Sequence, residues 1–378
     1  MPAPISLASG YGDFAVPAVA LEAAARTLHN LTGPLPVSEA PGAGTLREAL
    51  AARYRQRGAA QVQAEQVLIT PGAQAALLAV LSEVLGAEAR DVLLPTPNYF
   101  GFAELVRRAG GKLRELPLNA ADDYALSAET LRRALRPATR LLVLTNPNNP
   151  TGRLYTAAEW AALLEVTRGF PGLLVLSDEI YEGIVFEEDT AYAPAPTLLA
   201  QPDPHEQHIV VSGFSKSLAL AGWGLGCVVA PPALAAKLAE RQFALAGAVP
   251  MPSQAAALAA TTHADAIGAA LCRQLHPNRD LLLGWLRALP GQPAFTAPKG
   301  TYYVFADFTR FLPPSLPPIA ASAALTAELA AAGVLAVDGG TCGAPGFLRL
   351  SYAVPAADLR EALRRLSTFV AEFFGMGD

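Results

Sequence analysis

The sequence predicts an α/β fold in which helices cover both faces of a mostly parallel sheet, with a smaller α+β domain beside it. Two observations lead to this prediction. Between residues 41 and 280, short apolar runs alternate with helical segments, a pattern typical of parallel strands that are buried on both faces. After about residue 280, an alternating strand and longer helices replace this pattern. We therefore expect a large domain over 41–280 and a small domain over 281–378. The N-terminal arm over 1–40 is expected to form part of the small domain.

The composition is that of a globular protein. The chain has 378 residues, 52% apolar and 16% charged, which is enough for a large core and typical of folded domains. The net charge of −5, without a basic run, argues against a nucleic-acid partner. The three cysteines, Cys227, Cys272 and Cys342, are scattered and odd in number. They predict neither a disulfide framework nor a zinc site, and they indicate a reducing compartment.

The N-terminus lacks the basic and apolar regions of a signal peptide, and the apolar stretches are too short or too interrupted to span a bilayer. We therefore expect a soluble cytoplasmic protein with no membrane partner.

Along the large domain, capping residues and turn residues mark the element ends. The arm has no sustained period, so we expect it to be extended. Thr45 and Glu48 have the spacing of a capping box, and so do Thr156 and Glu159. The expected helices cover 45–58, 73–85, 102–109, 127–136 and 156–169, and the expected strands cover 67–70, 91–95, 141–145, 173–177, 209–212 and 225–230.

The small domain has longer elements. A helix is expected around 281–289 and an alternating strand at 302–305, and the proline-rich segment 313–318 reads as a surface connection. A helix over 320–332, a strand at 347–352 and a last helix from Pro355 to about Phe374 complete the prediction.

Lys216 lies where the apolar run that begins at Val210 ends in small residues, ahead of a second apolar run that starts at Leu225. A lysine at the carboxyl end of a strand, partly removed from water, has an amine available as a nucleophile. A solvated loop lysine is the alternative. The residues at the other strand ends favour the first interpretation.

Ligands of open parallel sheets gather at the carboxyl ends of the strands. Gly72-Ala73-Gln74 follows one strand and opens a helix, which leaves backbone N–H groups free for an anion such as a phosphate. An ordinary strand-to-helix turn is the alternative. Tyr99 follows the next strand and can stack on a flat ring, although tyrosine is also common in protein cores.

Further polar residues follow three other strands or lie within them. Segment 146–152 reads Asn-Pro-Asn-Asn-Pro-Thr-Gly, and its two X-Pro bonds stiffen the loop that presents the asparagines. A turn without a functional role is the alternative. Asp178 ends a strand and, if buried, needs a partner such as a protonated ring nitrogen; a helix cap is the alternative. Tyr181 can point its phenol into the same pocket. Arg349, alone in an apolar strand, fits a bidentate carboxylate ligand or an internal salt bridge.

In this order along the chain, the residues resemble the fold type I, pyridoxal-phosphate-dependent aminotransferases of class I/II, the aspartate aminotransferase superfamily. The resemblance runs from Gly10 to Arg349, and segments 146–152, 178–181 and 212–226 are its most specific parts. It implies a seven-stranded sheet, pyridoxal 5′-phosphate as the cofactor, and a homodimer with active sites near the subunit interface. The implied activity moves an amino group between an α-amino acid and a 2-oxo acid.

The resemblance also implies a role for each matching residue. Lys216 would hold the cofactor as a Schiff base and act as the general base, and Asp178 would keep the ring nitrogen protonated so that the ring withdraws electrons. The other cofactor contacts would be Gly72, Ala73 and Gln74 at the phosphate, Tyr99 on the ring, Tyr181 and Asn149 at the 3′-oxygen, and Ser215 beside the lysine. Arg349 would clamp the substrate α-carboxylate, with Asn149, Gly10 and Tyr11 nearby.

Other functions stay open on the same scaffold. A C–S lyase, a cyclase, a racemase or a non-catalytic homologue with weakened cofactor binding would carry the same motifs. A nicotinamide dehydrogenase is disfavoured because no Gly-x-Gly-x-x-Gly follows the first strand. We expect no metal ion in the site.

The chain departs from the family pattern on the phosphate side. Gly224 replaces the arginine of the usual Gly-Trp-Arg-Leu-Gly, and Gly213 replaces the usual serine. The tyrosine expected shortly before Gly42 is also absent. Losing the arginine removes roughly 1.5–3 kcal/mol, or about one to two powers of ten in cofactor affinity. The candidates to replace the lost phosphate ligands are Ser212, Ser215, Ser217 or a residue of a partner subunit. Tyr11 and Ser253 are the candidates for the space of the missing tyrosine.

Overall fold

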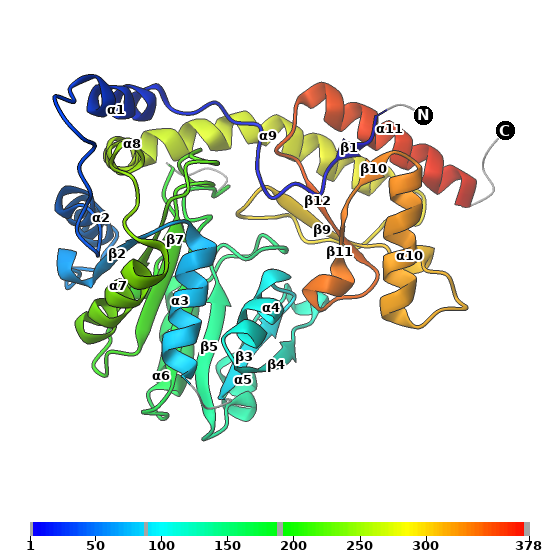
Figure 1. The fold of residues 1–378 in the computed structure, drawn as a ribbon. Helices are drawn as coiled ribbons and strands as arrows, with labels where there is room; N and C mark the ends of the chain where they lie inside the picture. The colour runs from blue at the N-terminus through cyan, green and yellow to red at the C-terminus, as the bar shows by residue number, and fades with distance from the viewer. Residues whose placement is uncertain (1–2, 87–89, 187–191, 374–378) are drawn as a thin grey trace.

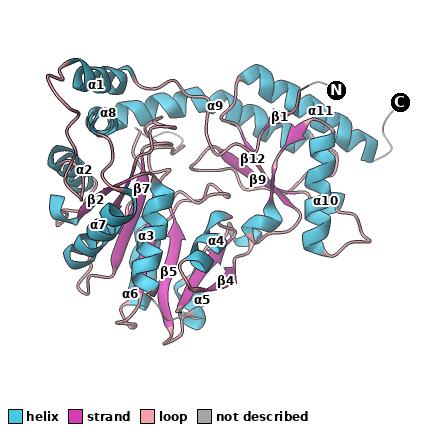
Figure 2. Ribbon diagram, viewed as in Figure 1, coloured by secondary structure: helices cyan, strands magenta, loops and turns pink. Residues whose placement is uncertain are grey.

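The computed structural model describes residues 3–86, 90–186 and 192–373. A seven-stranded sheet forms its centre, with the order β2-β8-β7-β6-β5-β3-β4 (Figures 1 and 2). Only β8 runs against the other strands of this sheet. The predicted α/β class with a mostly parallel sheet is confirmed. The strands are β2 (Val67–Thr70), β3 (Asp91–Thr96), β4 (Lys112–Pro117), β5 (Thr139–Thr145), β6 (Leu174–Asp178), β7 (His208–Gly213) and β8 (Gly226–Val229).

Helices cover both faces of this sheet. Neighbouring residues of one strand enter different cores: Leu68 packs on one face and Ile69 on the other. Such two-sided burial explains why the strands read as continuous apolar runs. One face is covered by α3 (Ala73–Leu85), α4 (Gly101–Arg108) and α7 (Pro232–Ala246), and the other by α2 (Gly44–Gln56), α5 (Ala128–Ala134), α6 (Ala157–Thr167) and α8 (Met251–Thr262).

A smaller α+β part combines both ends of the chain. Strand β1 (Ile5–Ser6) pairs in parallel with β10 (Val334–Leu335), so the blue and orange segments meet in Figure 1. A three-stranded antiparallel sheet has the order β11-β12-β9. Its members are β9 (Tyr303–Asp307), β11 (Val337–Asp338) and β12 (Phe347–Ser351), and the nearby helices are α9 (Ala264–Ala288), α10 (Pro318–Ala331) and α11 (Ala356–Phe373).

Helix α9 spans the top of the molecule in Figure 1 and is continuous through residue 280, where we placed the boundary between domains. Residue 374, to which we expected the last helix to extend, lies outside the described residues. Within the described ranges, no single helix is long and apolar enough to cross a membrane. The helices α8 and α9, which are bent relative to each other, meet the length and composition criteria only when they are taken together. Short 3₁₀ helices are η1 (Ala64–Gln66), η2 (Ala120–Asp122), η3 (Leu198–Ala200), η4 (Thr309–Phe311) and η5 (Gly339–Cys342).

Two local predictions are wrong. The N-terminal arm is not wholly extended, because α1 (Ala18–His29) forms within it and buries Ala20 and Ala24. This helix packs along α8, so a distant tertiary contact supplies the stability that its small apolar side chains could not signal.

The predicted capping box at the start of α2 is the second wrong prediction. The N-cap is Ala43, whose N–H donates to the side chain of Gln254 at 2.7 Å. Thr45 lies inside the helix, and Glu48 pairs with Arg55. The box of Thr156 and Glu159 at the start of α6, by contrast, is confirmed in both directions.

Candidate active site

The polar residues singled out in the sequence meet at the carboxyl edge of the seven-stranded sheet. Because β2, β3, β5, β6 and β7 are parallel, the segments that follow them lie along one edge. The charged and amide side chains there are deeply buried: Asp178 and Asn149 are each 6% exposed, Lys216 8% and Arg349 2%. The interpretation of Lys216 as a solvated loop lysine is therefore excluded.

The amine of Lys216 is held between the end of β7 and the N-terminal arm. Its Nζ donates to the carbonyl oxygen of Gly10 at 2.5 Å and lies 3.6 Å from the centre of the Tyr11 ring. Burial and, to a lesser extent, the charge of Arg349 lower the pKa of Lys216 to about 8, although the charge of Asp178 opposes the shift. Near neutral pH, more of this amine is therefore unprotonated than in an ordinary lysine, which suits a nucleophile.

Asp178 is the last residue of β6 and faces the same space. Burial raises the pKa of its carboxyl to about 6, while a hydrogen bond from the Ile180 N–H at 3.2 Å and the charge of Lys216 oppose this rise. The carboxyl is mostly ionised at neutral pH. Turns rather than an α-helix follow it, so the helix-cap alternative does not apply.

Arg349 reaches the site from β12. Its guanidinium donates to Asn149 Oδ1 at 3.0 Å and to the Ala8 carbonyl at 2.8 Å, and the Tyr303 ring centre lies 4.1 Å from Cζ. Within the described part of the chain, Arg349 has no salt bridge and its Nε has no hydrogen-bond partner. A buried guanidinium with an unused donor can bind a carboxylate. Because Oδ1 of Asn149 accepts from Arg349, its amide Nδ2 is left to donate elsewhere.

The predicted phosphate turn opens α3. Gly72 is its N-cap without a side-chain cap, so the first N–H groups of the helix, Ala73 and Gln74 among them, have no partner within the helix. The Gln74 amide donates to the Tyr99 hydroxyl at 2.9 Å, which links the turn to the aromatic ring. Gly226 passes beside this turn, where a Cβ would lie 2.5 Å from the Ala73 nitrogen. Only glycine permits this approach.

The substituted positions on the phosphate side are open or packed with apolar atoms. At Gly224, an added Cβ would meet no described heavy atom within 4 Å, and φ is +64°. At Gly213 a Cβ would lie 3.2 Å from the Ile180 side chain. Ser212 and Ser217 donate their hydroxyl protons to the carbonyls of Glu179 and Ile180. Neither proton is therefore available to a phosphate, and Ser215 is the remaining serine of this segment.

Comparison with known proteins assigns the family. The model for "Aminotransferase class I and II" matches residues 2–366. The chain belongs to this family. A probable aspartate/prephenate aminotransferase of Thermus aquaticus is 32% identical over 96% of this chain and 90% of its own length. An arginine–pyruvate transaminase of Pseudomonas aeruginosa is 30% identical over 98% of this chain and 90% of its own length.

The solved structures agree with this assignment. The crystal structure of aspartate aminotransferase from Rhizobium meliloti has a TM-score of 0.87 and 27% identity, and the match covers 97% of this chain and 91% of that one. The resemblance inferred from the sequence is confirmed, and the protein is a fold type I aminotransferase with the predicted seven-stranded sheet.

In this aminotransferase, two consecutive tyrosines that we did not predict as site residues, Tyr302 and Tyr303, contact residues of the site. The hydroxyls of Tyr303 and Tyr181 lie 2.7 Å apart, and the Tyr302 hydroxyl donates to the Gly10 carbonyl at 2.7 Å. Burial raises the pKa of Tyr181 well above its usual value. The available signal in the sequence was the succession of two tyrosines shortly after Gly300, because two buried phenols both need hydrogen-bond partners.

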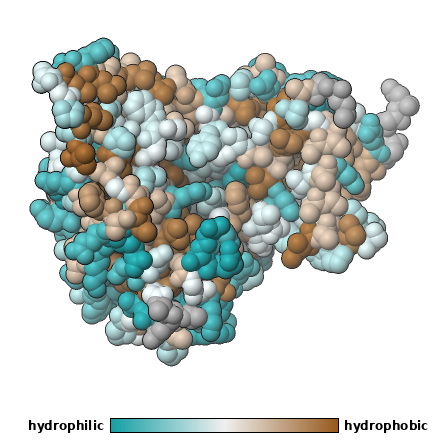
Figure 3. Space-filling view, viewed as in Figure 1, coloured by the Kyte–Doolittle hydropathy of each residue, from teal (hydrophilic) through white to brown (hydrophobic). Residues whose placement is uncertain are grey.

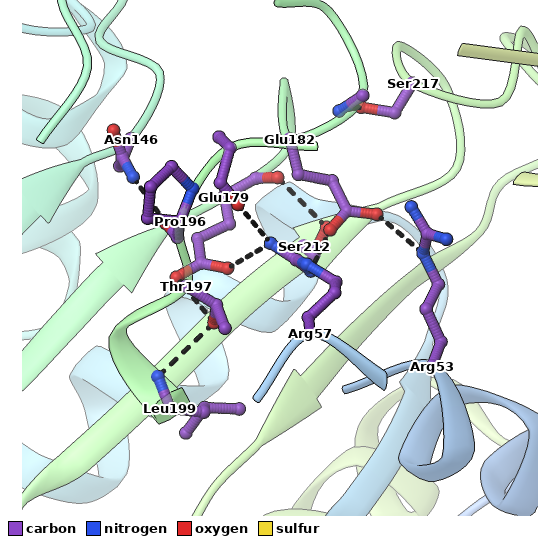
Figure 4. Close-up of polar contacts among 12 residues, drawn as sticks. Arg53, Arg57, Asn146, Glu179, Glu182, Pro196, Thr197, Leu199, Ser212 and Ser217 are labelled. Carbon is purple, nitrogen blue, oxygen red and sulfur yellow. Dashed lines mark hydrogen bonds and ion pairs between the residues drawn. The ribbon is translucent and has the colours of Figure 1, made fainter. Parts of the chain in front are cut away.

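A buried ionic cluster lies behind the site and was also missed (Figure 4). Arg57, the C-cap residue of α2, lies between Glu179 and Glu182, and Arg53 donates to Glu182 at 3.2 Å. Burial alone would raise the pKa of Glu182, but Arg57 and Arg53 lower it. The i,i+4 spacing of the arginines and the i,i+3 spacing of the glutamates were the available signals.

This cluster holds the turn that follows Asp178. The Glu179 carboxylate accepts from Thr197 at 3.1 Å and from the Leu198 N–H at 2.9 Å. The Ser217 hydroxyl donates to the Ile180 carbonyl and accepts from the Gly183 N–H. Since Ser217 is next to Lys216, these bonds connect the turn after Asp178 with the segment that carries the lysine.

Proposed function

We propose that this enzyme is a pyridoxal-phosphate-dependent aminotransferase that exchanges the amino group of an α-amino acid with the carbonyl oxygen of a 2-oxo acid. The observation that supports it most is the buried amine of Lys216, with its lowered pKa, opposite the buried carboxylate of Asp178. Each substrate leaves as the other type of acid, so the exchange needs no external oxidant or reductant.

The residues of the site fit the cofactor. When bound, pyridoxal 5′-phosphate supplies an aldehyde that condenses with amines and a ring that withdraws electrons from the substrate α-carbon. In our proposal, the first-turn amides of Ala73 and Gln74 bind its phosphate beside Gly72, whose own N–H donates to the Thr70 carbonyl. The remaining contacts are Tyr99 against the ring, Asp178 at the ring nitrogen, Asn149 and Tyr181 at the 3′-oxygen, Ser215 near the phosphate and Lys216 at the aldehyde.

In this proposal, different side chains of the protein bind the substrate and move its proton. Arg349 binds the α-carboxylate through the donor that it has free, while Asn149 fixes the guanidinium. The Gly10 carbonyl, which accepts from Lys216 and Tyr302, lies beside the amine. Lys216 Nζ would act as the general base that takes the proton from the substrate α-carbon, and it would hold this proton for its return. Tyr11 borders the substrate space.

We also propose a homodimer in the cytoplasm. Exposed apolar side chains gather on α1, on the segment after it and at the end of α7, where Figure 3 shows brown residues over α1 and beside it. Such a patch on a globular protein indicates an interface, and light scattering would measure the mass. The free cysteines suit a reducing compartment. The exposed apolar residues are Leu21, Leu28, Leu31, Leu35, Val37, Phe243 and Leu245.

The near-visible spectrum of the purified protein with added cofactor tests this function. Binding through Lys216 gives a band that amino acids bleach, with release of the matching 2-oxo acid. Lys216→Ala should lose the band and reduce turnover by at least about 10²–10⁴-fold, the usual contribution of a general base. Lys237→Ala, an exposed lysine of α7, is the matched control.

Other products would point to other reactions. Ammonia with pyruvate would indicate a lyase, a ring product a cyclase, and the opposite enantiomer a racemase. No band at excess cofactor would contradict the proposed function altogether.

A further inference from the structure

Two exposed aromatic rings border the buried charges of the site. Tyr11, 60% exposed, comes from the N-terminal arm, and Phe100, 43% exposed, comes from the start of α4. The Tyr11 ring centre lies 3.6 Å from Lys216 Nζ, and that of Phe100 lies 5.9 Å from Arg349 Cζ. The groups that we assign to the amine and to the α-carboxylate are therefore each flanked by an exposed ring.

Further aromatic rings lie near these two. Tyr99 packs against Phe100 with ring centres 4.7 Å apart, and the centre of the fully buried Tyr303 ring lies 4.1 Å from Arg349 Cζ. An aromatic group of a substrate can pack on exposed rings through offset or edge-to-face contacts.

The charges next to these rings do not suit a second substrate carboxylate. Burial raises the pKa values of Tyr99 and Asp178, and the cations that oppose this rise are Arg349 for Tyr99 and Lys216 for Asp178. In the proposed function, both cations already serve the α-carboxylate and the amine. Asp178 adds a negative charge. Within the described residues, Lys216 and Arg349 are also the cations that lie over the rings of Tyr11 and Phe100. A second carboxylate beside these rings would therefore leave water without a further cation from this part of the chain, which costs free energy.

We propose that this site selects amino acids with an aromatic or long apolar side chain over dicarboxylic amino acids. The side chain would cover the rings of Tyr11 and Phe100, which are otherwise in contact with water. The inference rests on the proposed function, because it uses Arg349 for the α-carboxylate. It also separates this chain from relatives whose names specify aspartate.

Substrate and ligand measurements on the cofactor-loaded protein test the selection. We expect kcat/KM for phenylalanine and leucine to exceed that for aspartate and glutamate by at least about tenfold, the ratio that 1.4 kcal/mol of extra contact produces. In calorimetric titrations, 3-phenylpropanoate should bind at least about tenfold more tightly than succinate. This second readout does not depend on turnover.

Variants locate the effect. Tyr11→Ala and Phe100→Ala should each reduce the phenylalanine-to-aspartate ratio and the matching ratio of ligand affinities by about three- to tenfold, whereas Tyr11→Phe retains the ring and the preference. Phe373→Ala removes a ring of similar exposure, 48%, on α11 and should leave both ratios unchanged. Circular dichroism and thermal melting identify any variant that does not fold, and the wild-type ratios decide the question in that case.

The outcomes separate the two proposals. Higher kcat/KM for aspartate or tighter binding of succinate would overturn the selection while leaving an aminotransferase. A cofactor band without oxo acid from any amino acid would contradict the proposed function, and the titrations would still test which side chain the site accepts.

Discussion

On the catalytic side of the site, the buried residues Lys216, Asp178, Asn149 and Arg349 come from four segments of the chain. Lys216 and Arg349 donate to the N-terminal arm, and Arg349 also donates to Asn149. On the phosphate side, the chain offers the first amides of α3 and glycines at positions 213 and 224. A helix N-terminus stabilises an anion by about 0.3–1 kcal/mol, whereas a charged hydrogen bond contributes about 1.5–3 kcal/mol. Retention of the cofactor should therefore depend mainly on its ring and its bond to the lysine.

The two sides also differ in what lies behind them. The Arg57–Glu179–Glu182 cluster holds the turn after Asp178, and Ser217 connects that turn to Lys216. The first-turn amides of α3 are held by the backbone of their own helix and by the close passage of Gly226. Four changes can sharpen or break this contrast.

The largest effect is expected from Arg57→Met, which leaves Glu179 and Glu182 buried with one arginine fewer. Breaking a buried pair in this way costs about 3–5 kcal/mol, so the free energy of unfolding in urea should fall by that amount. Arg55→Met, which removes the more exposed pair with Glu48, should cost less than about 1 kcal/mol. Equal losses in both variants would show that the cluster does not support the catalytic side.

Arg349→Lys keeps a positive charge and removes the planar fork. The value of kcat/KM for amino acids should fall about ten- to hundredfold, the equivalent of one charged hydrogen bond, because a lysine cannot bind Asn149 and a carboxylate in the same geometry. Cofactor affinity, measured by titration of the visible band, should change little. A large loss of cofactor affinity would mean that the two sides are not independent.

Gly224→Arg tests the weak phosphate side directly. The dissociation constant of the cofactor should fall about ten- to hundredfold if the guanidinium reaches the phosphate. Because φ at this position is +64°, the variant should also be less stable without cofactor by about 1–2 kcal/mol. Gly224→Ala carries the same strain without the charge, so it should lose stability and gain no affinity. If wild-type protein binds as tightly as Gly224→Arg, the phosphate side is not deficient.

The smallest effect concerns pH. In the proposed function, only the unprotonated amine of Lys216 captures the cofactor aldehyde. The capture rate of cofactor-free protein should therefore rise with pH and level off above a midpoint of about 8. Asp178 raises the pKa of Lys216 and Arg349 lowers it. Asp178→Asn should thus move the midpoint down and Arg349→Met should move it up. A midpoint near 10.5, the ordinary lysine value, would contradict the role of burial.

The helices and strands that we predicted have a clear pattern in their own residues, whereas those that we missed do not. Strands β5 and β7 were found because an apolar run that is buried on both faces is visible in the sequence itself. Strand β4, at the sheet edge, alternates charged and half-buried residues, and Lys112 to Pro117 contain no such run. Helices α7 and α8 and the first half of α9 were not predicted either, since their alanine-rich faces give a weak period.

The sequence by itself determined which polar residues follow the strands of a parallel sheet, because that order is local and the strand ends must share an edge. It therefore predicted that Lys216, Asp178, Asn149 and Tyr181 would be neighbours. Only the tertiary structure decided the surroundings of the lysine. Gly10 and Tyr11 contact Lys216 from about 200 residues away in the chain, and Arg349 arrives from another sheet. Burial by these distant segments shifts the pKa values of Lys216 and Asp178, and no local pattern encodes the removal of water.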